Sequence, residues 1–305
     1  MIFGLIVVAT ATITAITASA QESAAFLKLG VGARAIGMGG AYTAVADDVS
    51  AIAWNPAGLS SLAKRELGVT HAELAAGARY DFLAYGQPTK YGVLAAGAIY
   101  LTQSAIGGRD ASGRPTGSYG ASDTALNVGY ASKLASGLRL GGGLKYIRSS
   151  IAEQSAQSYA LDLGGQYELG RAGPGTPRLG LAILNLGPGL RFVDENSPLP
   201  LTVAAGVGYR LPVGLVLALD YKNHPHSRTS QVSIGTEYAL FSSFALRAGY
   251  GTTKPAGSAV GPAAALSGMA AGFGLKFLGG YTLAYAMPPF GELGNVQRFS
   301  LGARF

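Results

Sequence analysis

From about residue 65 to the end of the chain, apolar side chains recur at every second position. In the stretch LTVAAGVGYR, which spans residues 201–210, Leu, Val, Ala, Val and Tyr alternate with Thr, Ala, Gly, Gly and Arg. An alternation of period two places the two sets of side chains on opposite faces of a β-strand. The pattern therefore predicts an all-β protein whose strands meet an apolar medium on one face only.

Fourteen segments carry this alternation, and most are bounded by Gly, Pro, Ser or Asn. They span residues 65–77, 78–87, 90–102, 122–134, 136–149, 155–169, 176–187, 199–211, 213–223, 228–240, 242–252, 263–277, 279–288 and 294–305. Each is long enough for the roughly 9 to 11 tilted residues of a transmembrane strand. Short connections, such as residues 87–89 and 212, alternate with longer polar ones, notably 103–121, 187–198, 252–262 and 289–293. Residues 64–305 are therefore predicted to form a transmembrane antiparallel β-barrel of about 14 strands, with both ends at the periplasmic side.

The composition agrees with a membrane barrel. Hydrophobic residues make up 49% of the chain and charged residues only 13%, and the mean hydropathy of +0.28 is high for a soluble domain. Beyond residue 20, Gly, Ser, Thr or a charge interrupts every apolar stretch before it reaches the ~18 residues of a helical span. A closed barrel is the other way to satisfy all backbone groups in lipid.

Residues 1–20 are predicted to be a signal peptide. They form an apolar run that ends in Ala18-Ser19-Ala20, a cleavage site of the A-x-A type. No Lys or Arg precedes the run, so a membrane anchor is the alternative. The absence of Cys excludes a disulfide framework.

Several charged residues fall in the strand phase opposite to the large apolar side chains, and we expect them to line the lumen as a polar network. They are Lys145, Asp162, Asp220, Glu237, Arg247 and Arg298. The chain ends on three apolar residues in one phase, Phe299, Leu301 and Phe305, a pattern similar to the C-terminal signal that the barrel-assembly machinery recognises.

Residues 21–63 do not alternate and are rich in small residues. A barrel of fourteen strands is too wide for its own side chains to fill, so this segment is predicted to be a plug, or hatch, inside the lumen. Asp47-Asp48 is expected to cap a short hatch helix and to pair with Arg34, in preference to a catalytic or metal-binding role. Trp54 is expected to pack the hatch against the wall, with ligand stacking as the alternative, and residues 55–58 (NPAG) to form a turn into the first strand.

The hatch carries a motif that resembles the N-terminal hatch of the FadL superfamily of outer-membrane transporters, and more closely its PorV/PorQ branch. The residues of the motif are Gly32, Arg34, Gly37, Gly39, Gly40, Asp47, Asp48, Asn55, Pro56 and Gly58. The resemblance implies a fourteen-stranded barrel with a hatch. FadL proteins pass long-chain fatty acids and other hydrophobic molecules, whereas PorV proteins are associated with type IX secretion.

The net charge of +7 raises the question of nucleic acid binding. Basic residues occur singly between apolar ones, so lumen and headgroup positions explain them better and no nucleic acid is expected. His224-Pro225-His226 offers only two metal ligands, and no Ser-His-Asp order, nucleophile elbow or Cys nucleophile is present. We therefore expect no metal, no cofactor and no enzymatic activity.

Three functions remain open for a protein expected in the bacterial outer membrane. The first is passive transport of hydrophobic compounds of the long-chain fatty acid type. The second is a type IX secretion subunit that receives secreted cargo, and the third is a structural barrel that does not conduct. The expected partners are membrane lipids and the barrel-assembly machinery, together with hydrophobic small molecules or secreted proteins.

Overall fold

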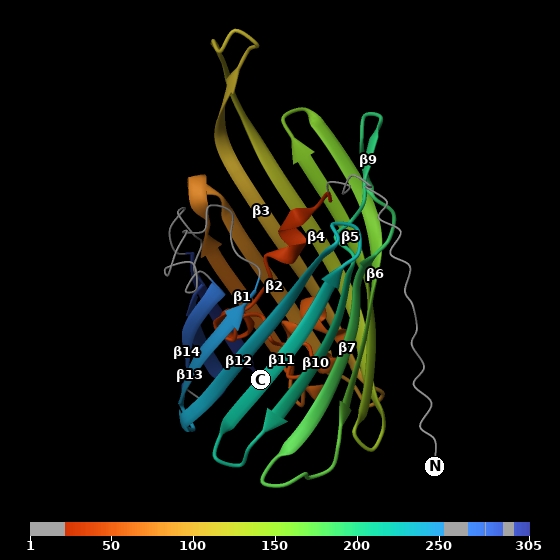
Figure 1. Ribbon diagram of the computed structural model, residues 1–305, viewed down its shortest axis with the longest axis vertical. Helices are drawn as coiled ribbons and strands as arrows, with labels where there is room; N and C mark the ends of the chain where they lie inside the picture. The colour runs from red at the N-terminus through yellow and green to blue at the C-terminus, as the bar shows by residue number, and fades with distance from the viewer. Residues whose placement is uncertain (1–21, 253–267, 278, 289–295) are drawn as a thin grey trace, which may run out of the picture.

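The chain folds as a closed β-barrel around its own N-terminal segment, as Figure 1 shows for the computed structural model. The structure describes residues 22–252, 268–277, 279–288 and 296–305, without the side chains of 104–106. Fourteen strands form the wall, each antiparallel to its neighbours, and the last strand pairs with the first to close it. The predicted fold, an antiparallel barrel of 14 strands around an N-terminal hatch, is confirmed.

The wall strands are β1 (Glu66–Glu73), β2 (Arg79–Pro88), β3 (Val93–Arg109), β4 (Pro115–Ala135), β5 (Leu138–Ile151), β6 (Gln154–Glu168), β7 (Thr176–Leu186), β10 (Thr202–Arg210), β11 (Leu215–His224), β12 (Thr229–Phe241), β13 (Phe244–Gly251), β14 (Met269–Phe277), β15 (Tyr281–Met287) and β16 (Gln297–Arg304). We call the end where β1 begins and β16 ends the inner mouth. Short turns at residues 89–92, 136–137 and 242–243 also lie there, which assigns the inner mouth to the periplasm.

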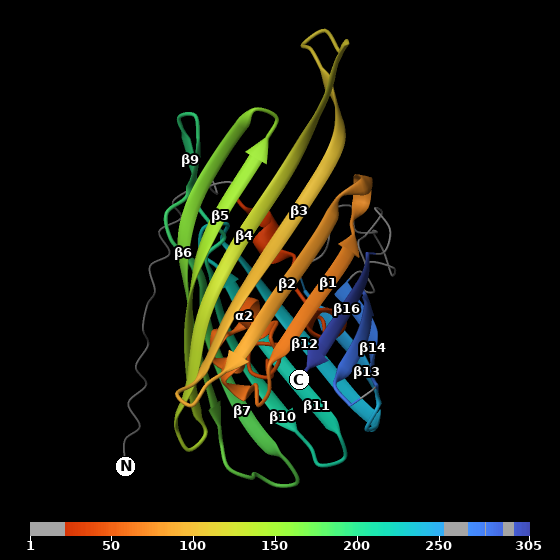
Figure 2. The same cartoon turned by 180° about the vertical axis from the view of Figure 1, so that it is seen from behind.

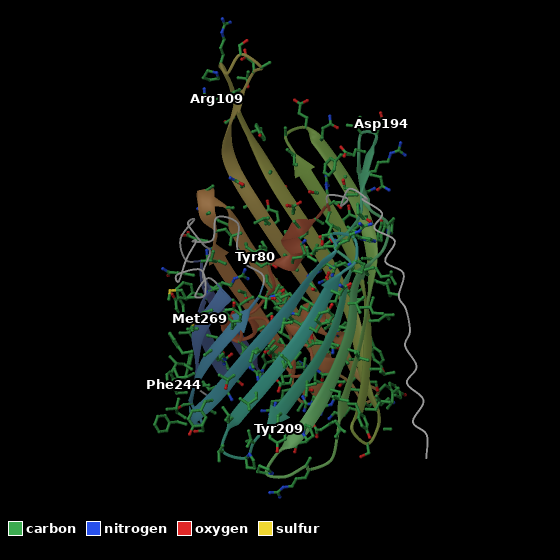
Figure 3. The ribbon with its side chains drawn as sticks, viewed as in Figure 1. Tyr80, Arg109, Asp194, Tyr209, Phe244 and Met269 are labelled. Carbon is green, nitrogen blue, oxygen red and sulfur yellow. The ribbon has the colours of Figure 1, made fainter. Side chains whose placement is uncertain are left out.

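The alternation of the sequence becomes the two faces of the wall. Leu144 and Leu181 point outward with 63% and 65% of their surface exposed, whereas their neighbours Lys145 and Ala182 point inward and are buried. Every strand of the wall exposes at least one large apolar side chain. Figure 3 shows Phe244 near the inner mouth. An apolar surface of this extent would be unfavourable in water, so lipid is its natural solvent.

The expectation of a long polar loop over residues 103–121 is wrong. Strands β3 and β4 continue as a hairpin beyond the rest of the wall, with Gly107 opposite Ser118, and Arg109 lies near its tip (Figure 3). The turn closes on Asp110, whose Oδ1 accepts the N–H groups of Ser112 and Arg114, each at 2.9 Å. Backbone pairing continues there although the apolar alternation ends. Water surrounds both faces of the hairpin, so neither face needs apolar side chains.

Other boundaries also differ from the prediction. The loop expected at 187–198 contains a small hairpin of β8 (Leu190–Phe192) and β9 (Glu195–Ser197), and the first strand ends at Glu73 before the short 3-10 helix η3 (Ala75–Gly77). Residues 1–20, most of the predicted loop 252–262 and the predicted loop 289–293 lie outside the described residues.

The hatch, residues 22–63, lies inside the barrel, where Figure 2 shows it from behind. It consists of short helices joined by turns: η1 (Ala25–Lys28), α1 (Ala33–Gly37), α2 (Ala51–Trp54) and η2 (Pro56–Ser61). The helix α1 contacts β13 to β16, whereas η2 contacts β3 to β6 on another part of the wall. The turn expected at residues 55–58 is therefore the start of a 3-10 helix, because Pro56 opens it and the Asn55 side chain accepts the Ala57 N–H. None of the helices that the structure describes is long and apolar enough to cross a membrane.

Candidate functional site

The hatch is held against the wall at glycine positions on the inner face of the strands. A Cβ on Gly164 would lie 2.1 Å from Asn55 Oδ1, and a Cβ on Gly249 would lie 2.2 Å from the backbone nitrogen of Gly39. Gly39 itself has a φ of +65° and would place a Cβ 2.6 Å from the backbone of Tyr250. Backbone meets backbone at Gly39 and Gly249, whereas Gly164 lies against the Asn55 side chain. None of these contacts leaves space for a side chain on the glycine.

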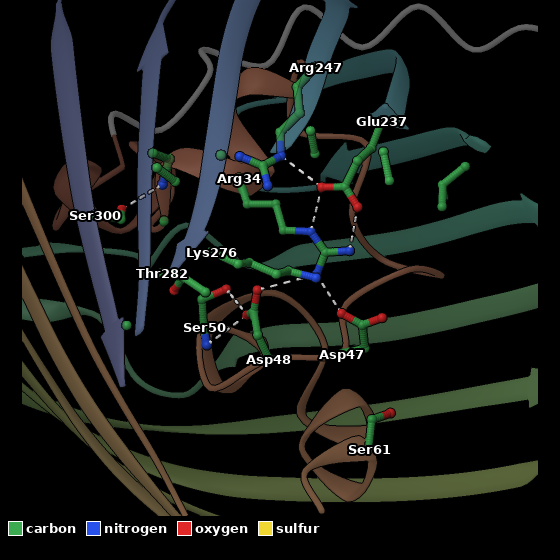
Figure 4. Close-up of a pocket in the computed structure, with 18 of the residues that line it drawn as sticks. Arg34, Asp47, Asp48, Ser50, Ser61, Glu237, Arg247, Lys276, Thr282 and Ser300 are labelled. Atoms are coloured by element: carbon green, nitrogen blue, oxygen red, sulfur yellow. Dashed lines mark hydrogen bonds and ion pairs between the residues drawn. The ribbon is translucent and has the colours of Figure 1, made fainter. Parts of the chain in front are cut away.

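An ionic cluster joins the hatch to β12 and β13 (Figure 4). Arg34 donates from Nε and Nη2 to the two carboxylate oxygens of Glu237, at 2.8 Å each. Arg247 donates to the same carboxylate at 2.7 Å, and Arg34 Nη1 also bonds Asp47. Arg34 also lies 3.4 Å from Asp48, so the expected pairing of Asp47-Asp48 with Arg34 is present. The structure adds Glu237 and Arg247, which the sequence placed only in the lumen, to the same cluster.

The two adjacent carboxylates of the hatch have different partners. Asp47 binds Arg34 and, at 2.8 Å, Arg210 of β10. Burial alone would raise the pKa of Asp47, but the two guanidinium groups lower it well below its usual range. Asp48 accepts the Ser50 N–H at 3.0 Å just before α2 and the Tyr42 hydroxyl at 2.7 Å. Asp47 therefore links the hatch to the wall, and Asp48 forms hydrogen bonds within the hatch.

Asp220 of β11 fixes the centre of the hatch. Its Oδ2 accepts the N–H groups of Tyr42 and Thr43, at 2.9 and 2.8 Å, and the Thr43 hydroxyl at 2.6 Å. Two residues further along β11, Lys222 donates to the carbonyl of Gly40 at 2.6 Å. Lys222 has the same strand phase as Asp220 but is not among the predicted lumen residues.

The remaining predicted lumen residues form two separate contacts. Lys145 pairs with Asp162 at 2.9 Å beside Asn185, where the pairing of β6 and β7 shifts its register. Arg298 donates to the carbonyls of Gly30 and Leu29, at 2.6 and 2.8 Å, and no carboxylate of the described chain pairs with it. The predicted single network is therefore four separate groups: Glu237 with Arg247, Asp220, Lys145 with Asp162, and Arg298.

A cavity of about 670 Å³ lies between the hatch and the wall on the outer side of the hatch. Apolar side chains from both parts line it, among them Leu27, Val31, Ile36, Trp54 and Leu184. Residues of the β11–β12 turn and of η1 also line it, so it reaches towards the outer mouth. We call it the outer cavity.

Four cations and no carboxylate line the outer cavity within the described chain. The cations are Lys28, Lys145, Lys222 and Arg298. Lys222 Nζ lies 4.4 Å from the ring centre of Trp54, and its nearest carboxylate oxygen, on Asp220, is 4.0 Å away. Lys28 and Lys145 pair with Glu22 and Asp162, respectively, so the charges that are only partly compensated are those of Lys222 and Arg298. An apolar space with such positive charges at its edge favours an amphipathic ligand with an acidic end.

Trp54 both packs and faces the outer cavity. Its Nε1 donates to the carbonyl of Val31 at 2.9 Å, and its ring meets Tyr42 edge to face at 6.1 Å. Packing of the hatch and stacking on a ligand, the two roles considered for Trp54, are therefore compatible in this position.

The other motif residues set the path of the hatch backbone. Gly32 precedes α1 with a φ of +78°, Gly37 packs on Arg247, and a Cβ on Gly58 would lie 2.4 Å from the Ala46 carbonyl oxygen. Pro56 lies against Gly141 of the wall. Phe299, Leu301 and Phe305 all point outward on or just after β16, where β1 pairs with it.

His224 and His226 contact Thr202 and the Leu199 carbonyl, respectively. In the described part of the chain, no group of three or more His, Cys, Asp or Glu side chains is placed to hold a metal ion.

Comparison with known proteins establishes the fold independently. The barrel is similar to the CymD monoaromatic hydrocarbon channel, with a TM-score of 0.62 at 15% identity over 91% of this chain and 98% of that one. The Ralstonia pickettii toluene transporter TbuX has a TM-score of 0.63 at 14% identity, over 90% and 98% of the two chains. A Pseudomonas aeruginosa FadL homologue has 0.54 at 12%, over 90% and 98%. The expected outer-membrane barrel of FadL type is thus confirmed as a fold.

Residues 5–166 match the model of a family described as Uncharacterised protein family (UPF0164). No curated protein sequence matches the chain.

Proposed function

The chain belongs to Uncharacterised protein family (UPF0164), and on the basis of its barrel, hatch and outer cavity we propose that it is a passive transporter of hydrophobic compounds across the outer membrane. The proteins of the same fold described above include a channel named for monoaromatic hydrocarbons and a transporter named for toluene. The outer cavity is the observation that carries the proposal, because its volume and apolar lining are typical of sites for small apolar ligands.

The charges around the outer cavity favour compounds with a carboxylate, as in a long-chain fatty acid. Arg298 and Lys222 are buried and bond mainly to backbone carbonyls, so their charge is only partly compensated. A carboxylate at the edge of the cavity would pair with one of them while its chain lies along Trp54 and Leu184.

Uptake into vesicles tests the proposal. Liposomes that contain the purified protein should take up a fluorescent fatty acid faster than empty liposomes. Ala204 lines the outer cavity and Ala205 points to lipid on the same strand, so Ala204→Trp should abolish uptake and Ala205→Trp should preserve it. Uptake equal to that of empty liposomes, or equal uptake by both variants, would contradict the proposal.

The type IX secretion role is the second candidate. The closer resemblance of the hatch motif to the PorV/PorQ branch favours it. This role requires protein partners. A pull-down from native membranes that recovers neither secretion components nor secreted cargo would remove it.

We propose that a signal peptide directs export of the chain and that the barrel-assembly machinery inserts the barrel. Residues 1–20 would direct export as a signal peptide. Phe299, Leu301 and Phe305 would be read by the barrel-assembly machinery, and their outward position on the closing strand supports this.

A further inference from the structure

A second cavity, of about 940 Å³, opens at the inner mouth, on the periplasmic side of the hatch. Figure 4 shows part of its lining. Residues of the turns at 171–176 and 211–214 line it, together with the inner ends of strands from both sides of the barrel. It shares no lining residue with the outer cavity. We call it the inner cavity.

The inner cavity has a large excess of positive charge. Nine Lys and Arg side chains line it and only four carboxylates, Asp47, Asp48, Glu66 and Glu237. The cations are Arg34, Lys133, Arg139, Arg171, Arg178, Arg210, Arg247, Lys276 and Arg304. Basic residues that are isolated in the sequence are therefore gathered by the fold in one place.

The four carboxylates of the inner cavity balance part of this charge. Glu237 pairs with both Arg34 and Arg247, and Asp47 pairs with both Arg34 and Arg210. Together with Asp48, which lies 3.4 Å from Arg34, these carboxylates balance the three guanidinium groups, and Glu66 balances Arg304. The excess positive charge of the cavity therefore lies with its other five cations.

A third shared carboxylate leaves a donor without a partner. Glu168 accepts from Arg178 at 2.5 Å and from Arg139 at 3.5 Å. Arg139 Nη1 is buried and has no hydrogen-bond partner in the described chain, and the same holds for Ser61 Oγ, which also lines the cavity. Buried donors of this kind are costly unless an acceptor reaches them.

Three further cations line the inner cavity with their side chains exposed. Lys133, Arg171 and Lys276 form no ion pair among the residues that the structure describes. In Figure 4, Lys276 extends towards the Arg34 cluster. These groups are free to bind a solute that enters from the periplasm.

We propose that the inner cavity binds a small multivalent anion, one that carries several carboxylate or phosphate groups. Seven of the nine cations are Arg, and a guanidinium group binds carboxylates and phosphates through two parallel hydrogen bonds. A cleft with an excess of one sign of charge and walls of low dielectric constant also concentrates counter-ions. The cavity lies within the barrel, and its volume is that of a small-molecule site.

Calorimetric titration of the purified full-length protein in detergent tests this site, with pyrophosphate and citrate as probes. We expect binding that weakens as sodium chloride is added, because salt screens the charges. Arg139→Gln should weaken binding about tenfold, since it removes a charged hydrogen bond. Arg114→Gln, at the tip of the β3–β4 hairpin, removes the same charge at the opposite end of the barrel and should leave binding unchanged.

The absence of binding heat for both probes at low salt would overturn the proposal, as would equal losses in the Arg139 and Arg114 variants. Circular dichroism of each variant checks the barrel. If Arg139→Gln does not assemble, Lys276→Gln, at an exposed position, takes its place in the test. We expect this variant to bind the probes severalfold more weakly. The measurement uses no vesicles and no hydrophobic ligand, so its outcome is separate from that of the uptake experiment.

Discussion

Arg34 of the hatch and Glu237 of β12 form a two-pronged ion pair, with both nitrogen–oxygen distances at 2.8 Å. The two residues are 203 positions apart in the chain. Both side chains are largely buried, with 19% and 13% of their surfaces exposed. A pair of this geometry resists any movement of the hatch away from the wall.

Removing the Glu237 carboxylate should loosen the hatch. Glu237→Gln leaves Arg34 and Arg247 without their shared charge, and breaking a buried ion pair on one side costs about 3 kcal/mol. We expect a lower free energy of unfolding in urea and a larger ion conductance in planar bilayers. Glu153→Gln, in the exposed β5–β6 turn, removes the same charge outside the lumen. Conductance and stability equal to those of this control would contradict a fastening role.

The stability that Asp47 contributes should depend on pH. Arg34 and Arg210 lower the pKa of Asp47 in the folded protein, against the effect of burial, while the unfolded chain keeps the ordinary value of about 4. The contribution is therefore complete above that value and is lost as the pH falls towards the folded pKa. Asp47→Asn should be less stable than the unaltered protein by about 2 kcal/mol at neutral pH.

The measurement is urea unfolding of both proteins at about pH 7 and about pH 2.5, since the loss is spread over this acid range. The difference between them should shrink at the lower pH. A difference that stays constant would show that the Asp47 charge is not what matters.

Gly164 should not tolerate a methyl group. Gly164→Ala would place Cβ 2.1 Å from Asn55 Oδ1, at the contact between η2 and β6, and overpacking of this kind costs about 1–3 kcal/mol. Gly165→Ala is the matched control, because a Cβ there points outward and is 3.4 Å from Leu140. The midpoint of urea unfolding should fall for the first variant only. Equal midpoints would mean that the hatch can shift away from β6.

Trp54 offers a direct test of the outer cavity, since it is the only tryptophan in the chain. A brominated fatty acid that enters the cavity should quench its fluorescence, and so should a brominated alkane. Lys222→Met should weaken quenching by the acid about tenfold without changing that by the alkane, because it removes a charged partner of the carboxylate. Lys90→Met, in a turn at the inner mouth, is the control. Equal losses for acid and alkane would show that Lys222 does not pair with the carboxylate of the ligand.

The sequence by itself determined the wall of this protein. Strand phase is a local property, so the alternation along residues 201–210 already told which side chains face lipid and which face the lumen. The number of strands followed from counting such segments. The pattern failed at residues 103–121, where water surrounds both faces of the hairpin and selects no alternation.

Only the tertiary structure decided what meets inside the lumen. Arg34 and Glu237, or Gly164 and Asn55, come together because the barrel closes at one diameter and the hatch enters it in one orientation. Neither condition leaves a periodic trace in the sequence. The same holds for the charge of the inner cavity, since Arg139 and Lys276 lie on strands that closure alone brings to one mouth.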